Sequence, residues 1–252
     1  MTDTIEKYLI ERQRLMDASA YDPAFEKDAC GVGLVASLDG KPRREIVEMG
    51  IKALKNVWHR GAVDADGKTG DGAGIRIEVP QDFFREQAER TGHKPTEDPI
   101  CVGQIFLPRT NLAEQEAARA IVETEILHFG FYIYGWRQPP VDISVIGQKA
   151  ADTRPEIEQV MFRDARGRDA EELERSLYLC RRRIERRARE AAIPGFYICS
   201  LSHKSLIYKG MFLAADIDNF YLDLRDERFI SRIAIYHQRY STNTFCAGTS
   251  TG

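Results

Sequence analysis

The strongest constraint on the fold of this sequence is an abrupt change of character at residue 30. The first 29 residues are charged throughout, and Pro23 would end any helix that begins before it. Directly after them stands the apolar run CGVGLVA, residues 30–36. A short apolar run of this kind is typical of a strand buried in a core. The sequence therefore predicts a polar leader over residues 1–29 and a folded body over residues 30–252.

The body of the chain predicts many strands and a few long helices. Besides residues 30–36, strands are expected over 75–79, 100–107, 131–134, 141–146, 158–162, 196–200, 206–208 and 232–240, and helices over about 43–58, 112–129 and 170–191. The first helix carries an apolar stripe at helical spacing, made of Ile46, Val47, Ile51 and Leu54. Because strands and helices do not alternate regularly, the expected fold class is layered α+β.

The charge balance argues against nucleic acid or an anionic membrane as a partner. There are 36 basic and 39 acidic residues, for a net charge of -3. An arginine-rich stretch, residues 180–187, is interpreted as the solvated face of an amphipathic helix, because glutamates partly neutralise it. No run approaches the ~18 apolar residues of a membrane helix, and the N-terminus lacks an apolar signal core. We therefore expect a cytoplasmic protein.

The cysteines argue against a disulfide framework or a metal centre. The five are Cys30, Cys101, Cys180, Cys199 and Cys246, an odd number at wide spacings with no C-x-x-C pair. In a reduced compartment most cysteines are small buried hydrophobes. Cys30 differs because it opens a strand and is followed by Gly31 and Gly33, which would let a ligand approach the backbone. It is either a nucleophile or a buried strand cysteine, and on this segment alone the second interpretation is favoured.

Two further clusters of residues admit a functional interpretation. One is His59-Arg60-Gly61, followed by the glycine-dense run of residues 70–74 that contains Asp71 and Gly72. These residues form either tight turns around a site or the ordinary turns of a loop. The other is HQRYSTNT, residues 237–244, where an arginine at a strand end is followed by hydroxyl and amide side chains. That cluster is either a cradle for a carboxylate or a polar strand end with an exposed arginine.

Together and in this order, the three clusters resemble the class II glutamine amidotransferases, which belong to the N-terminal-nucleophile hydrolase superfamily. The phrases ADGKTGDGAG and RYSTNTF are similar to the large subunit of the glutamate synthases. The resemblance runs from about Cys30 to Phe245. It implies a four-layer α-β-β-α sandwich, here incomplete, and a glutaminase that releases ammonia for transfer to 2-oxoglutarate in glutamate biosynthesis.

The resemblance also implies a role for each candidate residue. The leader would be cleaved between Ala29 and Cys30, so that the freed α-amine accepts the proton of the Cys30 thiol. Arg239 would hold the α-carboxylate of glutamine, and Thr242 would add a hydroxyl to the same pocket. The pocket-shaping residues would be His59, Arg60, Gly61, Asp71 and Gly72.

The cofactors and partners follow from the same resemblance. A complete glutamate synthase uses FMN and an iron–sulfur cluster, which would lie in other domains or subunits. This chain is expected to hold no cofactor and no metal. Its partners would be glutamine as substrate and the remaining domains or subunits of a glutamate synthase.

The sequence departs from the family pattern after Phe245. The family next supplies a His-Asn-Gly-Glu segment that forms the oxyanion hole, and this chain contains no such segment. Losing one oxyanion donor typically lowers kcat by about 10²–10³, so the chain alone is expected to be a poor enzyme. The alternatives are a truncated, non-catalytic domain that binds glutamine or a partner chain, and, less favoured, another class II amidotransferase such as a purine-pathway or asparagine-forming one.

Overall fold

The computed structural model describes residues 7, 10–11, 13–15, 17 and 31–238, apart from the side chain of Arg60. The chain divides into two compact units, residues 1–30 and residues 31–252. In the first unit the described residues are helical, and Glu11 pairs with Arg14 at 2.8 Å. All of the described strands belong to the second unit.

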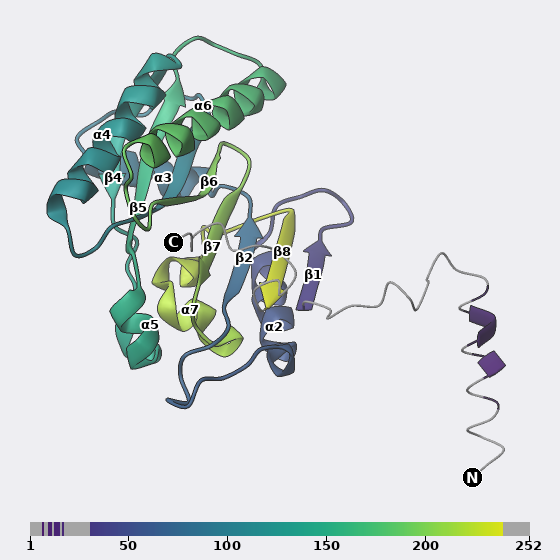
Figure 1. The fold of residues 1–252 in the computed structure, drawn as a ribbon. Helices are drawn as coiled ribbons and strands as arrows, with labels where there is room; N and C mark the ends of the chain where they lie inside the picture. The colour runs from purple at the N-terminus through teal and green to yellow at the C-terminus, as the bar shows by residue number, and fades with distance from the viewer. Residues whose placement is uncertain (1–6, 8–9, 12, 16, 18–30, 239–252) are drawn as a thin grey trace. The chain divides into compact units, whose positions relative to one another are not determined.

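A first antiparallel sheet brings together strands from both ends of the second unit. Its strand order is β1-β8-β2-β7 (Figure 1). The strands are β1 (Gly31–Ala36), β2 (Ala73–Ile77), β7 (Leu206–Gly210) and β8 (Ile233–Gln238). Helix α2 (Arg44–Asn56) covers one face of this sheet, and its predicted apolar stripe is buried there.

The predicted strand over residues 30–36 is confirmed for residues 31–36, but the prediction that this strand is buried is wrong. β1 is an edge strand that pairs only with β8 among the described strands. Its side chains alternate in direction, and Val32 and Leu34 point away from α2 and are 62% and 63% exposed. Leu34 is the register partner of Ile235, which is only half-buried. Part of the face of the first sheet opposite α2, around Val32, Leu34 and Ile235, is therefore apolar and not covered by other residues that the structure describes. We call it the open face.

A second antiparallel sheet is built by a continuous β-α-β-β-α-β unit. Its order is β4-β5-β3-β6, and α4 and α6 lie beside each other on one face (Figure 1). This connectivity and strand order is the ferredoxin-like arrangement. The elements are β3 (Ile100–Leu107), α4 (Leu112–His128), β4 (Phe131–Arg137), β5 (Glu156–Asp164), α6 (Ala170–Glu190) and β6 (Tyr197–Ser202). Asn111 and Asp169 cap the two helices through their side-chain oxygens.

The ferredoxin-like unit is inserted into a hairpin of the first sheet. Ile77 at the end of β2 pairs directly with Leu206 at the start of β7, so both ends of the insertion meet at one place. The helix-covered side has a hydrophobic core drawn entirely from residues 101–201. On the other side α3 (Gln81–Arg90), which was not predicted, buries Phe83 and Phe84. The insertion thus has the layout of a small domain.

The prediction of a strand over residues 141–146 is wrong. Val141 makes only an isolated bridge to Tyr221, and a 3₁₀ turn, η3 (Ile143–Val145), follows. The Asp142 carboxylate accepts a hydrogen bond from the Ser144 N–H at 2.9 Å, which bends the backbone out of an extended course. The other connecting elements are η2 (Trp58–Arg60), α5 (Gln148–Thr153), η4 (Ala214–Asp216), α7 (Ile217–Phe220) and η5 (Leu222–Arg225).

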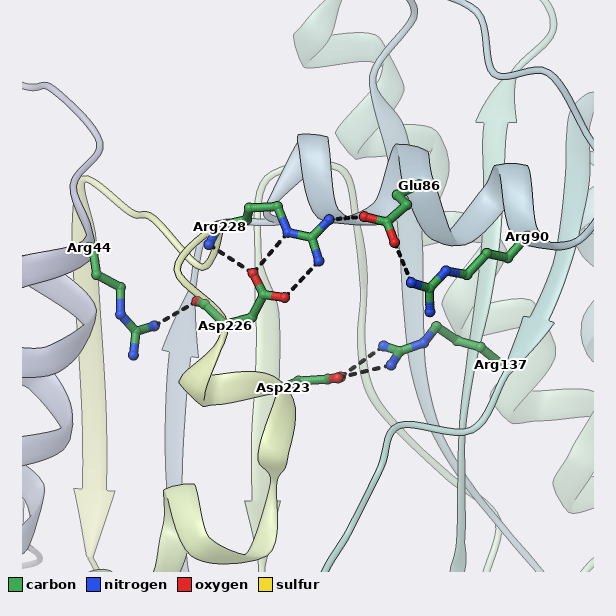
Figure 2. Close-up of polar contacts among 7 residues, drawn as sticks. All are labelled: Arg44, Glu86, Arg90, Arg137, Asp223, Asp226 and Arg228. Atoms are coloured by element: carbon green, nitrogen blue, oxygen red, sulfur yellow. Dashed lines mark hydrogen bonds and ion pairs between the residues drawn. The ribbon is translucent and has the colours of Figure 1, made fainter.

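Arginines from several elements converge on the segment around η5 (Figure 2). Arg137 of β4 donates two parallel hydrogen bonds to the Asp223 carboxylate, at 2.8 and 2.9 Å. Arg44 of α2 donates to the carbonyl oxygens of Leu224 and Asp226, at 2.8 and 3.1 Å. Since Arg137 belongs to the second sheet and Arg44 to the helix on the first, the η5 segment links the two sheets.

A second ion-pair chain ties the same segment to α3. Arg228 binds both oxygens of Asp226, at 2.9 and 2.7 Å, and also contacts Glu86, which in turn contacts Arg90 (Figure 2). This chain is more exposed than the Arg137–Asp223 pair, where the side chains are only 12% and 4% exposed. Exposed pairs contribute little to stability, so the buried Arg137–Asp223 pair is the important link.

We expect Asp223→Asn to lower the free energy of unfolding by about 3 kcal/mol, because it leaves the buried Arg137 guanidinium without a counter-charge. Urea denaturation measures the change. The double variant Arg137→Met/Asp223→Leu removes both charges and should recover part of the loss. Recovery is incomplete because the Tyr208 hydroxyl and Gln159 Oε1, which bond to this pair, each lose a partner. A single-variant cost close to zero would contradict the proposed link between the sheets.

Candidate active site

The three sequence clusters meet at one end of β8. Cys30, Arg239 and Thr242 lie outside the described residues, but the strands that lead to the first two are described. Gly31, the residue after Cys30, pairs directly with Gln238, the residue before Arg239. Paired Cα atoms in an antiparallel ladder are about 4.5–5.5 Å apart. Cys30 and Arg239 are therefore each bonded to one member of a single cross-strand pair.

The glycine-dense cluster lies on the other side of the same strand end. Ala73 pairs with Gln238 and Gly74 pairs with His237, so β8 is flanked by β1 on one side and by β2 on the other (Figure 1). Gly72 directly precedes β2, and its φ of +112° is a conformation that favours glycine. Clusters that are far apart in sequence are thus adjacent in the sheet.

The His59-Arg60-Gly61 segment contacts the same strand end through Gly61. A Cβ atom on Gly61 would lie 1.9 Å from Nε2 of Gln238, so a side chain there requires Gln238 to move. The Asp71 carboxylate accepts a hydrogen bond from the Ala62 N–H at 3.0 Å, and the Asp71 N–H donates to the Ala62 carbonyl at 3.2 Å. Asp71 therefore holds the two halves of the second cluster together. His59 is exposed in η2.

Gln238 is the residue on which the described parts of these clusters converge. It is only 2% exposed, and its Oε1 atom accepts no hydrogen bond among the residues that the structure describes. A buried polar atom without a partner is uncommon in proteins. No separate role was predicted for Gln238, because glutamine in a polar motif carries no specific signal.

The space beside Gly33 is filled by a side chain of the same chain. A Cβ atom there would lie 2.3 Å from the phenolic oxygen of Tyr236, the register partner of Gly33. The expectation that this glycine admits a ligand is therefore corrected: it admits the Tyr236 side chain.

A cavity of about 170 Å³ adjoins the strand end, and Gly72, Gly74, His237 and Lys209 contribute to its wall. Burial and, secondly, the charge of Lys209 hold the pKa of His237 below its ordinary value of 6.5. His237 therefore stays neutral over a wider pH range than a free histidine. Lys209 reaches this site only through cross-strand register with Gly74, which the sequence does not reveal.

The described cysteines are poor nucleophiles. Cys101, Cys180 and Cys199 are buried, as predicted for structural cysteines. Burial raises the pKa of the Cys180 and Cys199 thiols to about 12, and it raises that of Cys101 well above the ordinary value. None of these thiols ionises readily near neutral pH.

The described residues offer neither a cluster of metal ligands nor a helix that could span a membrane. Within residues 31–238 and the described part of the first unit, no group of three or more His, Cys, Asp or Glu residues is arranged to hold a metal ion. In the same part of the chain no helix has both the length and the apolar character needed to cross a bilayer.

Comparison with known proteins identifies the family. The model of the class II glutamine amidotransferases matches residues 30–249. The chain therefore belongs to the class II glutamine amidotransferases, which are enzymes, and the predicted family is confirmed.

Its relatives are glutamate synthases, as the resemblance predicted. The chain is 61% identical over 231 residues to the glutamate synthase [NADPH] large chain of Azospirillum brasilense. It is 40% identical over 225 residues to the chloroplastic ferredoxin-dependent glutamate synthase of Spinacia oleracea, and 37% over 229 residues to the glutamate synthase [NADPH] large chain of Bacillus subtilis (strain 168). These matches cover 92%, 88% and 89% of this chain but only 15%, 14% and 15% of the relatives.

We expect His237→Gln to flatten the pH dependence of stability below about pH 6.5. Because the pKa of His237 is lowered in the folded state, the unfolded chain binds the proton more readily, and stability is lost as the pH falls from about 6.5 toward the folded-state pKa. Urea unfolding at about pH 7.5 and about pH 5.5 measures the difference. An equal loss in the parent chain and the variant would contradict this assignment.

Proposed function

We propose that this chain is the glutaminase part of a glutamate synthase and that Cys30 is its nucleophile. The observation that carries the proposal is the direct pairing of Gly31 with Gln238. That pair brings the chain positions next to Cys30 and Arg239 to the same end of two hydrogen-bonded strands. Family membership supplies the reaction class, and the raised pKa values of Cys101, Cys180 and Cys199 make those buried thiols poor alternatives.

The proposed mechanism begins with removal of residues 1–29. Cleavage between Ala29 and Cys30 turns the Cys30 amide nitrogen into an α-amine, which has a typical pKa of about 7.7–8 and can accept the thiol proton. A family match that starts at residue 30 supports this boundary. Without cleavage the nitrogen is an amide, which is not basic, and the thiol has no local base.

The thiolate would then attack the side-chain amide carbon of glutamine. The sulfur–carbon bond forms, the carbon–nitrogen bond breaks, and the proton taken by the α-amine leaves with the nitrogen as ammonia. Water hydrolyses the resulting thioester to glutamate and restores the thiol. Arg239 would bind the substrate α-carboxylate through two parallel hydrogen bonds, and Thr242 would add a hydroxyl beside it. Gly61, Asp71 and Gly72 would shape the pocket through the contacts described above, with His59 and Arg60 beside them.

The open face supports the four-layer sandwich as the complete fold of the domain. Val32 and Leu34 are more than half exposed on it, next to Ile235. A contiguous apolar face of a sheet is normally covered by another layer. We propose that a second sheet of the amidotransferase domain packs on this face, with helices outside it.

The ammonia would be used by the remaining parts of a glutamate synthase. There it would be added to 2-oxoglutarate, in a reaction for which FMN and an iron–sulfur cluster outside this chain supply the electrons. We propose the cytoplasm as the compartment, because the described cysteines are free thiols, as expected in a reducing compartment.

Covalent labelling tests the nucleophile directly. A diazoketone analogue of glutamine should attach to Cys30 of the processed chain, because the analogue places a reactive carbon where the amide carbon would lie. Peptide mass spectrometry locates the adduct and intact mass reports loss of residues 1–29. Cys30→Ala should abolish labelling, whereas Cys199→Ala, a matched change at a buried cysteine, should leave it intact. A processed chain that gains no adduct would favour a non-catalytic domain, and labelling with residues 1–29 retained would refute the need for cleavage.

Replacing Arg239 by lysine tests the carboxylate site. Lysine keeps the charge but loses the planar pair of donors, so the KM for glutamine, or the concentration of analogue giving half-maximal labelling, should rise about tenfold or more. Arg232→Lys is a suitable control, since Arg232 pairs with Glu78 at the opposite end of β8. Equal values for Arg239→Lys and the parent chain would remove Arg239 from the binding site.

A further inference from the structure

A second cavity has a wall distinct from that of the cavity beside His237, except for Lys209. It has a volume of about 450 Å³ and lies between the ferredoxin-like insertion and the first sheet. The insertion contributes the end of β3, helix α5 and the start of β5, and the rest of the chain contributes β7 and α7. Cavities of about 300–1,000 Å³ are typical of small-molecule sites.

The wall of this cavity is mainly aromatic and aliphatic. Phe106 and Ile157 come from the insertion, and Phe212, Phe220 and Tyr221 come from the other side. Phe212, Phe220 and Tyr221 are buried against one another, with Phe220 and Tyr221 ring centroids 4.8 Å apart. This side of the cavity is therefore preformed, and it would accept the apolar part of a ligand.

Cations on the wall lack carboxylate partners. The Arg154 side chain makes no hydrogen bond or ion pair with the described residues, and Lys209 forms no ion pair with them. The Lys209 Nζ atom lies 3.9 Å from the ring centroid of Tyr197. Arg109 donates only to the carbonyl oxygens of Arg154 and Asp152, at 3.2 and 3.1 Å. Three cations thus line the cavity without being neutralised by ion pairs in the described structure.

Two carboxylates also reach the wall, but they do not cancel this charge. Asp152 accepts a hydrogen bond from the Gln148 side chain at 2.7 Å, and Glu114 lies at the start of α4. The lining therefore keeps an excess of one positive charge beside a large apolar surface. Cations beside partly desolvated apolar walls favour an anionic group on a ligand, because the anion replaces their lost hydration.

We propose that this cavity is a binding site for a small organic carboxylate with an apolar, aromatic-sized body. The carboxylate binds at the cationic part of the wall, to which Arg154 and Lys209 contribute, and the body packs against Phe212 and Phe220. Lys209 also contributes to the wall of the cavity beside His237, so a ligand here contacts a residue shared with the candidate active site. The proposal depends on described residues alone and not on the role of Cys30.

Calorimetric titration of the 252-residue chain with 4-phenylbutyrate tests the site, with the uncharged 4-phenylbutanamide as comparator. The carboxylate should bind at least about tenfold more tightly than the amide. Lys209→Met and Arg154→Met should each weaken its binding about tenfold, a loss typical of one charge-assisted contact. Lys204→Met, at an exposed lysine on the loop between β6 and β7, should leave the affinity unchanged.

A second control separates this cavity from the open face. Leu34→Ser removes apolar surface from the open face and should not alter 4-phenylbutyrate binding. Circular dichroism checks that each variant is folded, and Arg154, which is half-buried with no described side-chain partner, is the substitution that should perturb folding least. Equal affinities for carboxylate and amide, an affinity unchanged in Arg154→Met, or no saturable binding up to about 10 mM would each overturn the proposal.

Discussion

The backbone pairing of β1 with β8 is the constraint on which the candidate site depends. The two strands are separated by most of the chain, yet their ladder aligns Gly31 with Gln238 and Gly33 with Tyr236. Because side chains alternate along a strand, a slip of one residue would reverse every side chain at the site. The fit of Tyr236 over Gly33 and of Gln238 against Gly61 helps to fix this register, since a Cβ at either glycine would collide with the partner side chain.

The ferredoxin-like insertion accounts for the long stretch of sequence between the parts of the candidate site. It leaves the strand pairing of the first sheet intact. Both ends of the insertion meet at the Ile77–Leu206 pair, so the first sheet closes as if β2 and β7 formed an ordinary hairpin. The insertion has a core of its own and is held to the first sheet by the buried Arg137–Asp223 pair. The same junction creates the large cavity beside Lys209. One insertion thus accounts for both the separation of the clusters and the proposed second binding site.

The local elements could be predicted from the sequence more fully than their environment. β3 has the predicted bounds, Ile100–Leu107, because its apolar run ends at a proline. The exposure of Val32 and Leu34 was missed, since apolar composition does not reveal which face of a sheet is covered. The Asp142 turn overrode strand propensity after residue 141. The order of the three sequence clusters was enough to identify the family. By contrast, the contacts of these clusters with Gln238 and the approach of Lys209 to His237 depend on strand register between distant parts of the chain, which the sequence does not reveal.

The central claim is that one glutamine site contains both Cys30 and Arg239. A crystal structure of the processed chain after reaction with the diazoketone analogue tests it most directly. The account predicts density continuous from the Cys30 sulfur to an adduct whose α-carboxylate lies about 2.7–2.9 Å from the Arg239 guanidinium. An adduct on Cys30 whose carboxylate points away from Arg239, with the two residues on opposite sides of the sheet, would contradict it.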